Sequence, residues 1–215
     1  MQVAPTGLAR PVAGRPMGRP RHAQGRPAGR PFLVHALGLL GLTCWPLVAG
    51  AAPLAGTRNV VLHAADGAQL VIGQVAFTPG ADGVASFALK VDHGRFTDHF
   101  LSMREFKCLA GGTEILCHVP YPYPHPGTVA AGQWGWLEHG LLFFYKKPTE
   151  FGAKLWNGVY FRLQAEGDKL VGIPQAIDLN LIATPPAKAD QPPYRPALRD
   201  DMPAGARWFR RLTIE

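Results

Sequence analysis

The chain has 215 residues, of which 47% are hydrophobic and 17% charged, and this length and composition predict one domain with a sizeable core. Its formal net charge of +7 at pH 7 first suggests a nucleic-acid-binding protein. Residues 1–51, however, carry six of the 22 basic residues and none of the 15 acidic ones, so the rest of the chain is close to neutral. The basicity therefore belongs to the leader, and we expect no nucleic-acid partner.

The leader is typical of a secretory signal peptide. An Arg-Pro-rich segment precedes an apolar run that begins at Phe32, and the small residues Ala49-Gly50-Ala51 follow it. We expect cleavage after Ala51 and a periplasmic or secreted protein. Met17 is an alternative start that would give a leader of ordinary length. An uncleaved membrane anchor and a lipoprotein signal at Cys44 are the alternatives, and an anchor would be the only part of the chain expected in a membrane.

Residues 52–183 predict a mainly antiparallel β domain, either a sheet or a partly open barrel, because short strand-like segments alternate with Gly/Pro turns. These segments are residues 59–63, 69–78, 84–91, 100–109, 114–119, 159–166 and 169–173. Residues 184–215 predict a Pro-rich C-terminal arm whose last residues are apolar enough to dock on the domain.

Residues 134–147 interrupt this pattern of strands. Their apolar side chains recur at the spacing of one helical face, at Trp134, Leu137, Leu141, Phe144 and Tyr145. Two lysines and then a proline end the segment, as is common at the C-terminus of a helix. We therefore expect one amphipathic helix packed on the sheet, which makes the fold class α+β.

Cys108 and Cys117 are the two cysteines outside the leader. If Gly112-Thr113 forms a two-residue turn, the flanking strands place the two cysteines directly opposite each other, on the face that points to the core. An exported protein meets an oxidising compartment, so the sequence predicts a structural disulfide. The same register places His118 on the opposite face, beside Lys107.

A metal site is the alternative chemical interpretation of this region. The segment DHGRFTDH repeats an Asp-His pair, and the candidate ligands are Asp92, His93, Asp98, His99, His118 and His125. Such ligands would make the protein a metal-binding protein or a metal-dependent hydrolase. Arg95 and Lys107 oppose this interpretation, and no pair of histidines has the spacing that supplies two ligands from one rigid element. We expect no cofactor and no catalytic residue.

The aromatic residues give the other functional hint. The segment PYPYPHP should be extended and stiff, which presents Tyr121, Tyr123 and His125 at low entropic cost. With Trp134 and Trp136 they form a candidate binding surface for a protein, peptide or glycan of the cell envelope. The alternative is a stiff crossover whose tyrosines pack on the sheet.

Three blocks, FKCL…CHVPYPYP, WLEHGLLFFYKKPTEFGAKLWNG and GIPQAIDLNLIA, resemble an uncharacterised family of small exported proteobacterial proteins. The resemblance extends from about residue 84 to the C-terminus. It implies a location outside the cytoplasm and no particular activity. We therefore expect an exported, disulfide-linked, non-enzymatic binding or structural protein of the bacterial envelope.

Overall fold

The computed structural model describes residues 55–101 and 104–215. The expected signal peptide, its cleavage after Ala51 and the alternative start at Met17 lie outside the described residues. Within the described ranges, no helix has the length and apolar character needed to cross a membrane.

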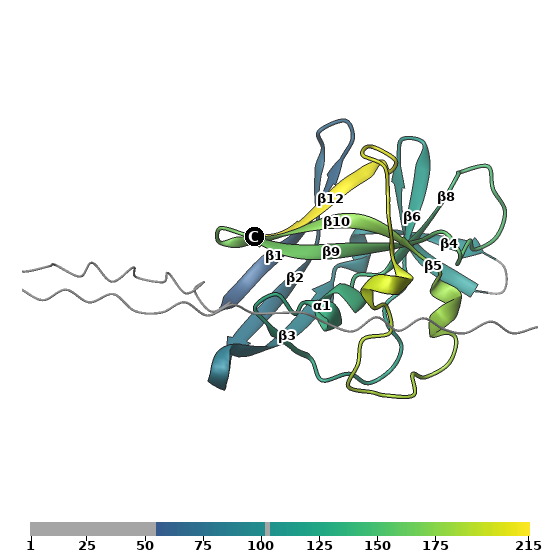
Figure 1. Ribbon diagram of the computed structural model, residues 1–215. Helices are drawn as coiled ribbons and strands as arrows, with labels where there is room; N and C mark the ends of the chain where they lie inside the picture. Colours follow the sequence, from purple (N-terminus) through teal and green to yellow (C-terminus); the bar gives the residue numbers. More distant parts are fainter. Residues whose placement is uncertain (1–54, 102–103) are drawn as a thin grey trace, which may run out of the picture. The chain divides into compact units, whose positions relative to one another are not determined.

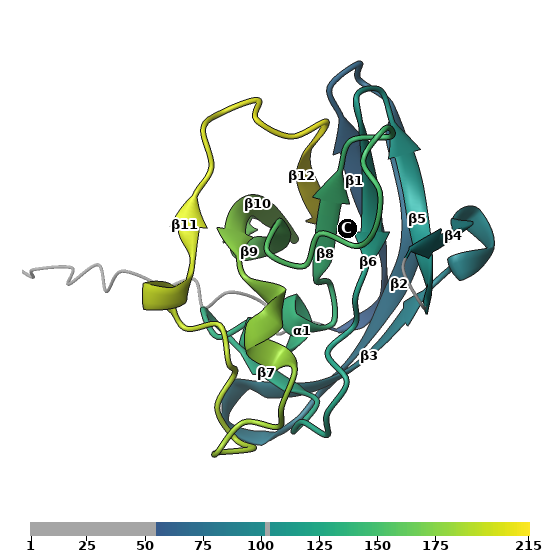
Figure 2. The same ribbon diagram turned by 90° about the vertical axis from the view of Figure 1, so that its right-hand side faces the viewer.

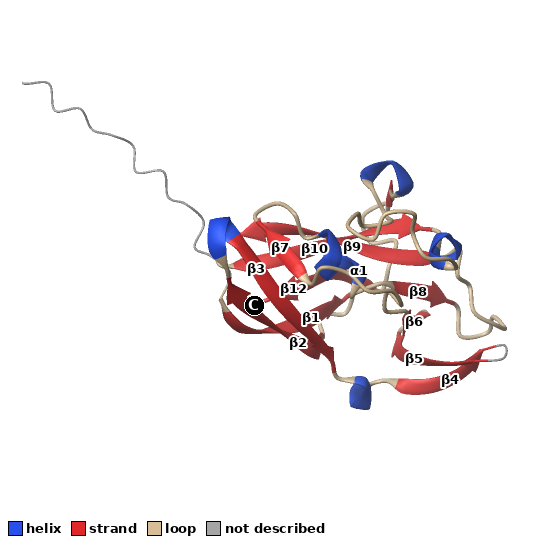
Figure 3. Ribbon diagram, turned by 90° about the horizontal axis from the view of Figure 1, so that it is seen from below, coloured by secondary structure: helices blue, strands red, loops and turns tan. Residues whose placement is uncertain are grey.

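The described residues form an antiparallel β protein with little helix, as the sequence predicts (Figures 1 and 3). The strands are β1 (Gly56–Ala64), β2 (Gln69–Pro79), β3 (Val84–Val91), β4 (Thr97–Leu101), β5 (Arg104–Gly111), β6 (Glu114–His118), β7 (Thr128–Ala130), β8 (Phe143–Lys146), β9 (Gly158–Glu166), β10 (Lys169–Ile177), β11 (Asp200–Asp201) and β12 (Phe209–Ile214). The helical segments are α1 (Gly135–His139) and the 3₁₀ turns Ala81–Gly83, His93–Arg95, Leu179–Ile182 and Pro196–Leu198.

The strands make one sheet in the order β4-β5-β6-β8-β9-β10-β12-β1-β2-β3-β7, and β11 pairs with β10. The sheet begins at β4 and ends at β7 without closing into a barrel. It curves strongly, and α1 lies against β7 and β9 on its inner side (Figure 2).

The expected helix over residues 134–147 is not confirmed. Only the five residues Gly135–His139 are α-helical, and Phe143–Lys146 is strand β8. Phe143 and Phe144 are both fully buried, because β8 lies between β6 and β9 and has a core on each face. A strand buried on both faces has a continuous apolar run, and such a run also fits a helical period.

Two hydrophobic clusters cover the opposite faces of the central strands. The first contains Leu116, Phe143 and Phe161 and continues between β1, β2 and β12. The second contains the disulfide and Phe144, and it is closed by residues from α1, from the segment after β6 and from the C-terminal arm. Every residue of β6 is buried because the strand has a cluster on each face, with Ile115 and Cys117 in the second and Leu116 in the first.

The C-terminal end of the chain is a strand in the middle of the sheet. Residues of β12 pair with β10 on one side and with β1 on the other. Its start is fixed by Glu114, which accepts a hydrogen bond from the Trp208 backbone nitrogen at 2.8 Å. The Glu114 carboxylate also lies 3.1 Å from Nη1 of Arg207, an electrostatic contact without hydrogen-bond geometry.

Candidate functional site: an arginine-lined cavity

A cavity of about 520 Å³ lies between α1, strand β9 and the C-terminal arm. This volume is within the range of small-molecule sites, roughly 300 to 1,000 Å³. Its walls come from three stretches that are far apart in the chain: Gly132–Glu138, Tyr160–Ala165 and Pro192–Arg199. The cavity therefore exists only in the folded domain, where the arm lies over α1 and β9.

Glu138 and Tyr160 form a buried polar pair at this cavity. Glu138 is 5% exposed and Tyr160 is 1% exposed. The Tyr160 hydroxyl donates to Oε2 of Glu138, and the Leu163 backbone nitrogen donates to Oε1 at 2.6 Å. Burial raises the pKa of the Glu138 carboxyl, while these two donors and the guanidiniums of Arg199 and Arg162 oppose the shift. Burial and the adjacent carboxylate also raise the pKa of the Tyr160 hydroxyl.

Three arginines, Arg162, Arg195 and Arg199, line the same cavity. The Arg199 guanidinium lies over the Tyr160 ring, with its Cζ atom 4.6 Å from the ring centroid. Its Nε is buried and has no hydrogen-bond partner among the described residues. In the described part of the chain, the basic residues that form ion pairs are Arg95, Lys107 and Arg207. None of the three cavity arginines is therefore paired with a carboxylate in this way. The cavity is therefore cationic.

His139 attaches the C-terminal arm to α1. Because a carbonyl oxygen can only accept, Nδ1 of His139 carries the proton and donates to the Gly135 carbonyl oxygen at 2.6 Å. Its Nε2 is then the acceptor for the Tyr194 backbone nitrogen at 3.1 Å. The Tyr194 ring stacks on the imidazole, and its hydroxyl donates to the Asp178 carbonyl oxygen at 2.8 Å. Burial lowers the pKa of His139 to about 4. The imidazole is thus neutral and fully used in holding the wall of the cavity.

The disulfide prediction is confirmed. Cys108 and Cys117 are bonded, and β5 pairs with β6 in the expected register around the Gly112-Thr113 turn. The sulfur atoms lie in the second core cluster. Gly112 has a positive φ of 47°, and a side chain there would also collide with the Trp208 indole. The bridge is part of the core on the side of the sheet that the arm covers.

His118 lies in the core and not on the surface, which corrects the sequence-based expectation. It is 6% exposed, and Nε2 donates to the Gly140 carbonyl oxygen at 3.0 Å. Its Nδ1 therefore accepts from Nε2 of His93, also at 3.0 Å. Burial lowers the pKa of His118 to about 4. Lys107 pairs instead with Asp98 at 2.6 Å, so the expected contact between the lysine and His118 is absent.

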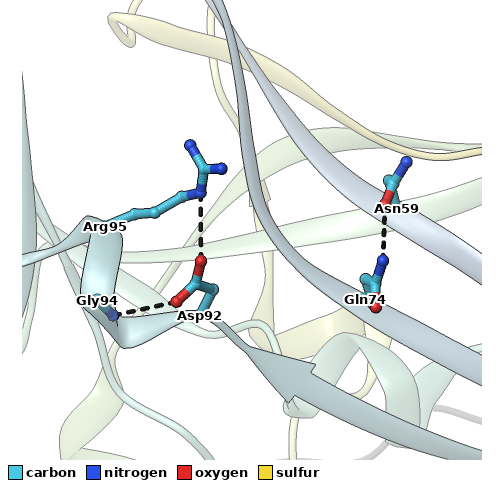
Figure 4. A network of polar contacts seen from close by, with 5 residues as sticks. All are labelled: Asn59, Gln74, Asp92, Gly94 and Arg95. Atoms are coloured by element: carbon cyan, nitrogen blue, oxygen red, sulfur yellow. Dashed lines mark hydrogen bonds and ion pairs between the residues drawn. The ribbon is translucent and has the colours of Figure 1, made fainter.

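The candidate metal ligands do not converge. His93 contacts His118, but Asp98 and His99 are on the edge strand β4, and His125 stacks on the Trp136 ring. Asp92 is engaged by the Gly94 backbone nitrogen and the Arg95 side chain, each at 3.2 Å (Figure 4). Among the residues that the structure describes, no group of three or more His, Cys, Asp or Glu side chains is placed to hold a metal ion.

The expected aromatic surface is largely inside the protein. Tyr121, Trp134 and Trp136 are less than 10% exposed, Tyr123 is half-buried and His125 is exposed. Tyr121 packs against Tyr123 and Trp136, so the Pro-Tyr segment closes the second core cluster as a crossover. Of the five candidates, Trp134 also lines the arginine-lined cavity.

Of the residues that line the cavity, only Trp134 was predicted from the sequence as a site residue. Glu138 and His139 are adjacent in the sequence, and each has its own partner, Tyr160 and Tyr194 respectively. The one signal in the sequence was an isolated glutamate inside an otherwise apolar run. The cavity arginines carry no local signal, because their proximity depends on the path of the arm.

Neither the family models nor the curated proteins nor the solved structures with which the chain was compared include a match to it.

Proposed function

We propose that this is an exported, disulfide-linked binding protein of the bacterial envelope that takes a small organic anion in the arginine-lined cavity. The observation that carries the proposal is the excess of positive charge at a partly enclosed site. Three arginines face the cavity, while its one carboxylate already accepts two hydrogen bonds from the protein. Guanidinium groups hold carboxylates and phosphates with paired hydrogen bonds, so an anion is the ligand that this site favours.

The state of the titratable groups at the cavity favours binding over acid–base catalysis. Both nitrogens of His139 are occupied by backbone groups, and both oxygens of Glu138 are occupied by donors. The Tyr160 hydroxyl donates to that carboxylate, and its pKa is raised. A general base needs a free basic atom within reach of the substrate; His139 offers none without breaking a buried hydrogen bond, and Glu138 already accepts from two protein donors.

Export is supported by two independent features. The leader has the three zones of a secretory signal peptide. The Cys108–Cys117 disulfide is of the kind that persists in oxidising compartments such as the periplasm. The resemblance to exported proteobacterial proteins agrees with both and remains a prediction.

The test uses the full chain, produced in an exporting bacterial host and titrated calorimetrically with benzoate, phenyl phosphate and the neutral control benzyl alcohol. We expect the anions to bind and the alcohol not to bind. Arg162→Gln and Arg199→Gln should each weaken anion binding by about tenfold or more, as expected for the loss of a charged hydrogen bond.

Arg210→Gln is the matched control, because Arg210 is exposed on β12 and does not line the cavity. Urea unfolding of each variant checks that it is folded. Failure of both anions to bind at millimolar concentration would refute the proposal, as would an equal loss of affinity in the Arg210→Gln protein.

A further inference from the structure

A second cavity, of about 490 Å³, adjoins the arginine-lined cavity. It lies between the ends of β2 and β3, strand β7 and the hairpin that joins β9 to β10. The two cavities share Gly132, Trp134 and Ala165 as lining residues. The two cavities therefore lie next to each other, with the Trp134 side chain at both.

The second cavity is apolar where the first is cationic. Its side-chain lining is mainly aliphatic and aromatic: Val84, Ala85, Val129, Ala130, Trp134 and Leu170. Ala85, Val129 and Leu170 are core residues, so the inner wall of this cavity is continuous with the first hydrophobic cluster. The charged residues Arg58, Asp168 and Lys169 also contribute to its lining, and the Arg58 side chain donates to the Asp168 carbonyl oxygen.

We infer that the two cavities together bind a single-chain amphiphile with a carboxylate headgroup, the carboxylate at Arg199 and Arg162 and the alkyl chain past Trp134 in the apolar cavity. This inference rests on the proposed function and specifies the class of its ligand. A cationic cavity next to an apolar cavity matches a molecule with one acidic end and one apolar end. Neither a small polar anion nor an uncharged hydrocarbon would use both.

We take the headgroup to be a carboxylate and not a phosphate because of Glu138. Glu138 lies in the same compartment, beside the arginines. A phosphate carries up to two negative charges near neutral pH, whereas a carboxylate carries one, so the phosphate meets the stronger repulsion from the Glu138 carboxyl. The planar donor arrangement of the arginines matches a carboxylate and a phosphate alike, so Glu138 is the feature that separates the two headgroups.

Calorimetric titration of the full exported chain with hexanoate, octanoate and decanoate, below their micellar concentrations, tests the inference. Affinity should rise by about fourfold per methylene, the gain expected for burying each methylene group, until the apolar cavity is filled. Decanol and decyl phosphate are the comparison ligands, and both should bind more weakly than decanoate.

Val84→Glu places a charge in the apolar cavity at a position that is 40% exposed on β3, where it should not prevent folding. In this variant the dependence of affinity on chain length should disappear while benzoate still binds. Val71→Glu is the matched control, because Val71 is 37% exposed on β2 and does not line either of the two cavities. It should leave the chain-length dependence unchanged.

The possible results separate this inference from the proposed function. If benzoate binds but affinity does not rise from hexanoate to decanoate, the inference of an amphiphilic ligand is refuted and the proposed anion site is supported. If decyl phosphate binds better than decanoate, the inference of a carboxylate headgroup is refuted. If neither benzoate nor any alkyl carboxylate binds, both proposals fail.

Discussion

Acidification from pH 7 to pH 4 is expected to destabilise the domain through two buried histidines, His118 and His139. In the folded protein each has a pKa of about 4, against an ordinary value of 6.5. Burial is the largest cause, and electrostatic effects of neighbouring side chains lower the pKa values further: His93 acts on His118, and Arg199 and His125 act on His139. Between pH 6.5 and pH 4 the unfolded chain therefore binds protons at these sites that the folded chain does not.

The sign and the size of the effect follow from this difference. When the unfolded state binds more protons, the free energy of unfolding rises with pH, so this contribution to stability is complete above pH 6.5 and is lost as the pH falls toward 4. A pKa difference of about 2.5 units corresponds to about 3 kcal/mol for each histidine. Two such losses are a large part of the 5 to 15 kcal/mol that is usual for a domain.

Urea unfolding followed by tryptophan fluorescence at pH 7, 5.5 and 4 measures the effect. His118→Gln and His139→Gln should each lower stability at pH 7, because they disturb buried hydrogen bonds. Each should also remove about half of the additional loss between pH 7 and pH 4. The reasoning is refuted if the pH dependence of both variants equals that of the unsubstituted protein, since the protons would then be taken up elsewhere.

Two further substitutions test how the core is held together. Replacing both Cys108 and Cys117 with serine removes a bridge between residues nine positions apart and should lower the free energy of unfolding by about 2 to 3 kcal/mol. In the unsubstituted chain, the oxidised form should be lighter than the reduced form by the mass of two hydrogens. Glu114→Gln should cost about 3 to 5 kcal/mol in urea unfolding, because it leaves the largely buried Arg207 guanidinium without its carboxylate partner. If Glu114→Gln is no less stable at neutral pH, the carboxylate does not fix the start of β12.

Local patterns were enough to predict the disulfide and most of the longer strands, but not β7, β11 or β12. The β9 strand alternates apolar and polar residues, and the Gly112-Thr113 turn sets the register that brings Cys108 and Cys117 together. Each depends on residues close together in the sequence. The same local reasoning failed at β8, because the identity of that segment is decided by β6 and β9 on either side and by the two cores that cover it.

The burial of side chains was harder to predict than the strands themselves. Sequence reasoning assumed one apolar face and one exposed face for the hairpin, and that assumption placed His118 at the surface. The structure has a core on each face: the disulfide faces the second cluster, and His118 lies against Phe96 and Phe143 of the first. Tyr121 and Trp136 are buried because they close the second cluster. The apolar and polar pattern of a strand does not reveal whether a distant segment of the chain packs on its second face.

The arginine-lined cavity is an extreme case of this dependence on distant segments. Glu138 comes from α1, Tyr160 from β9 and Arg199 from the arm, and no two of them are neighbours in the sequence. The arm is held over the cavity by the hydrogen bond from Tyr194 to His139, next to the glutamate that accepts from Tyr160. One short helix thus supplies both the acceptor inside the cavity and the anchor of its wall. The polar pair Glu138-His139 in an apolar run thus has a partner on each side of α1: Tyr160 for the glutamate and Tyr194 for the histidine.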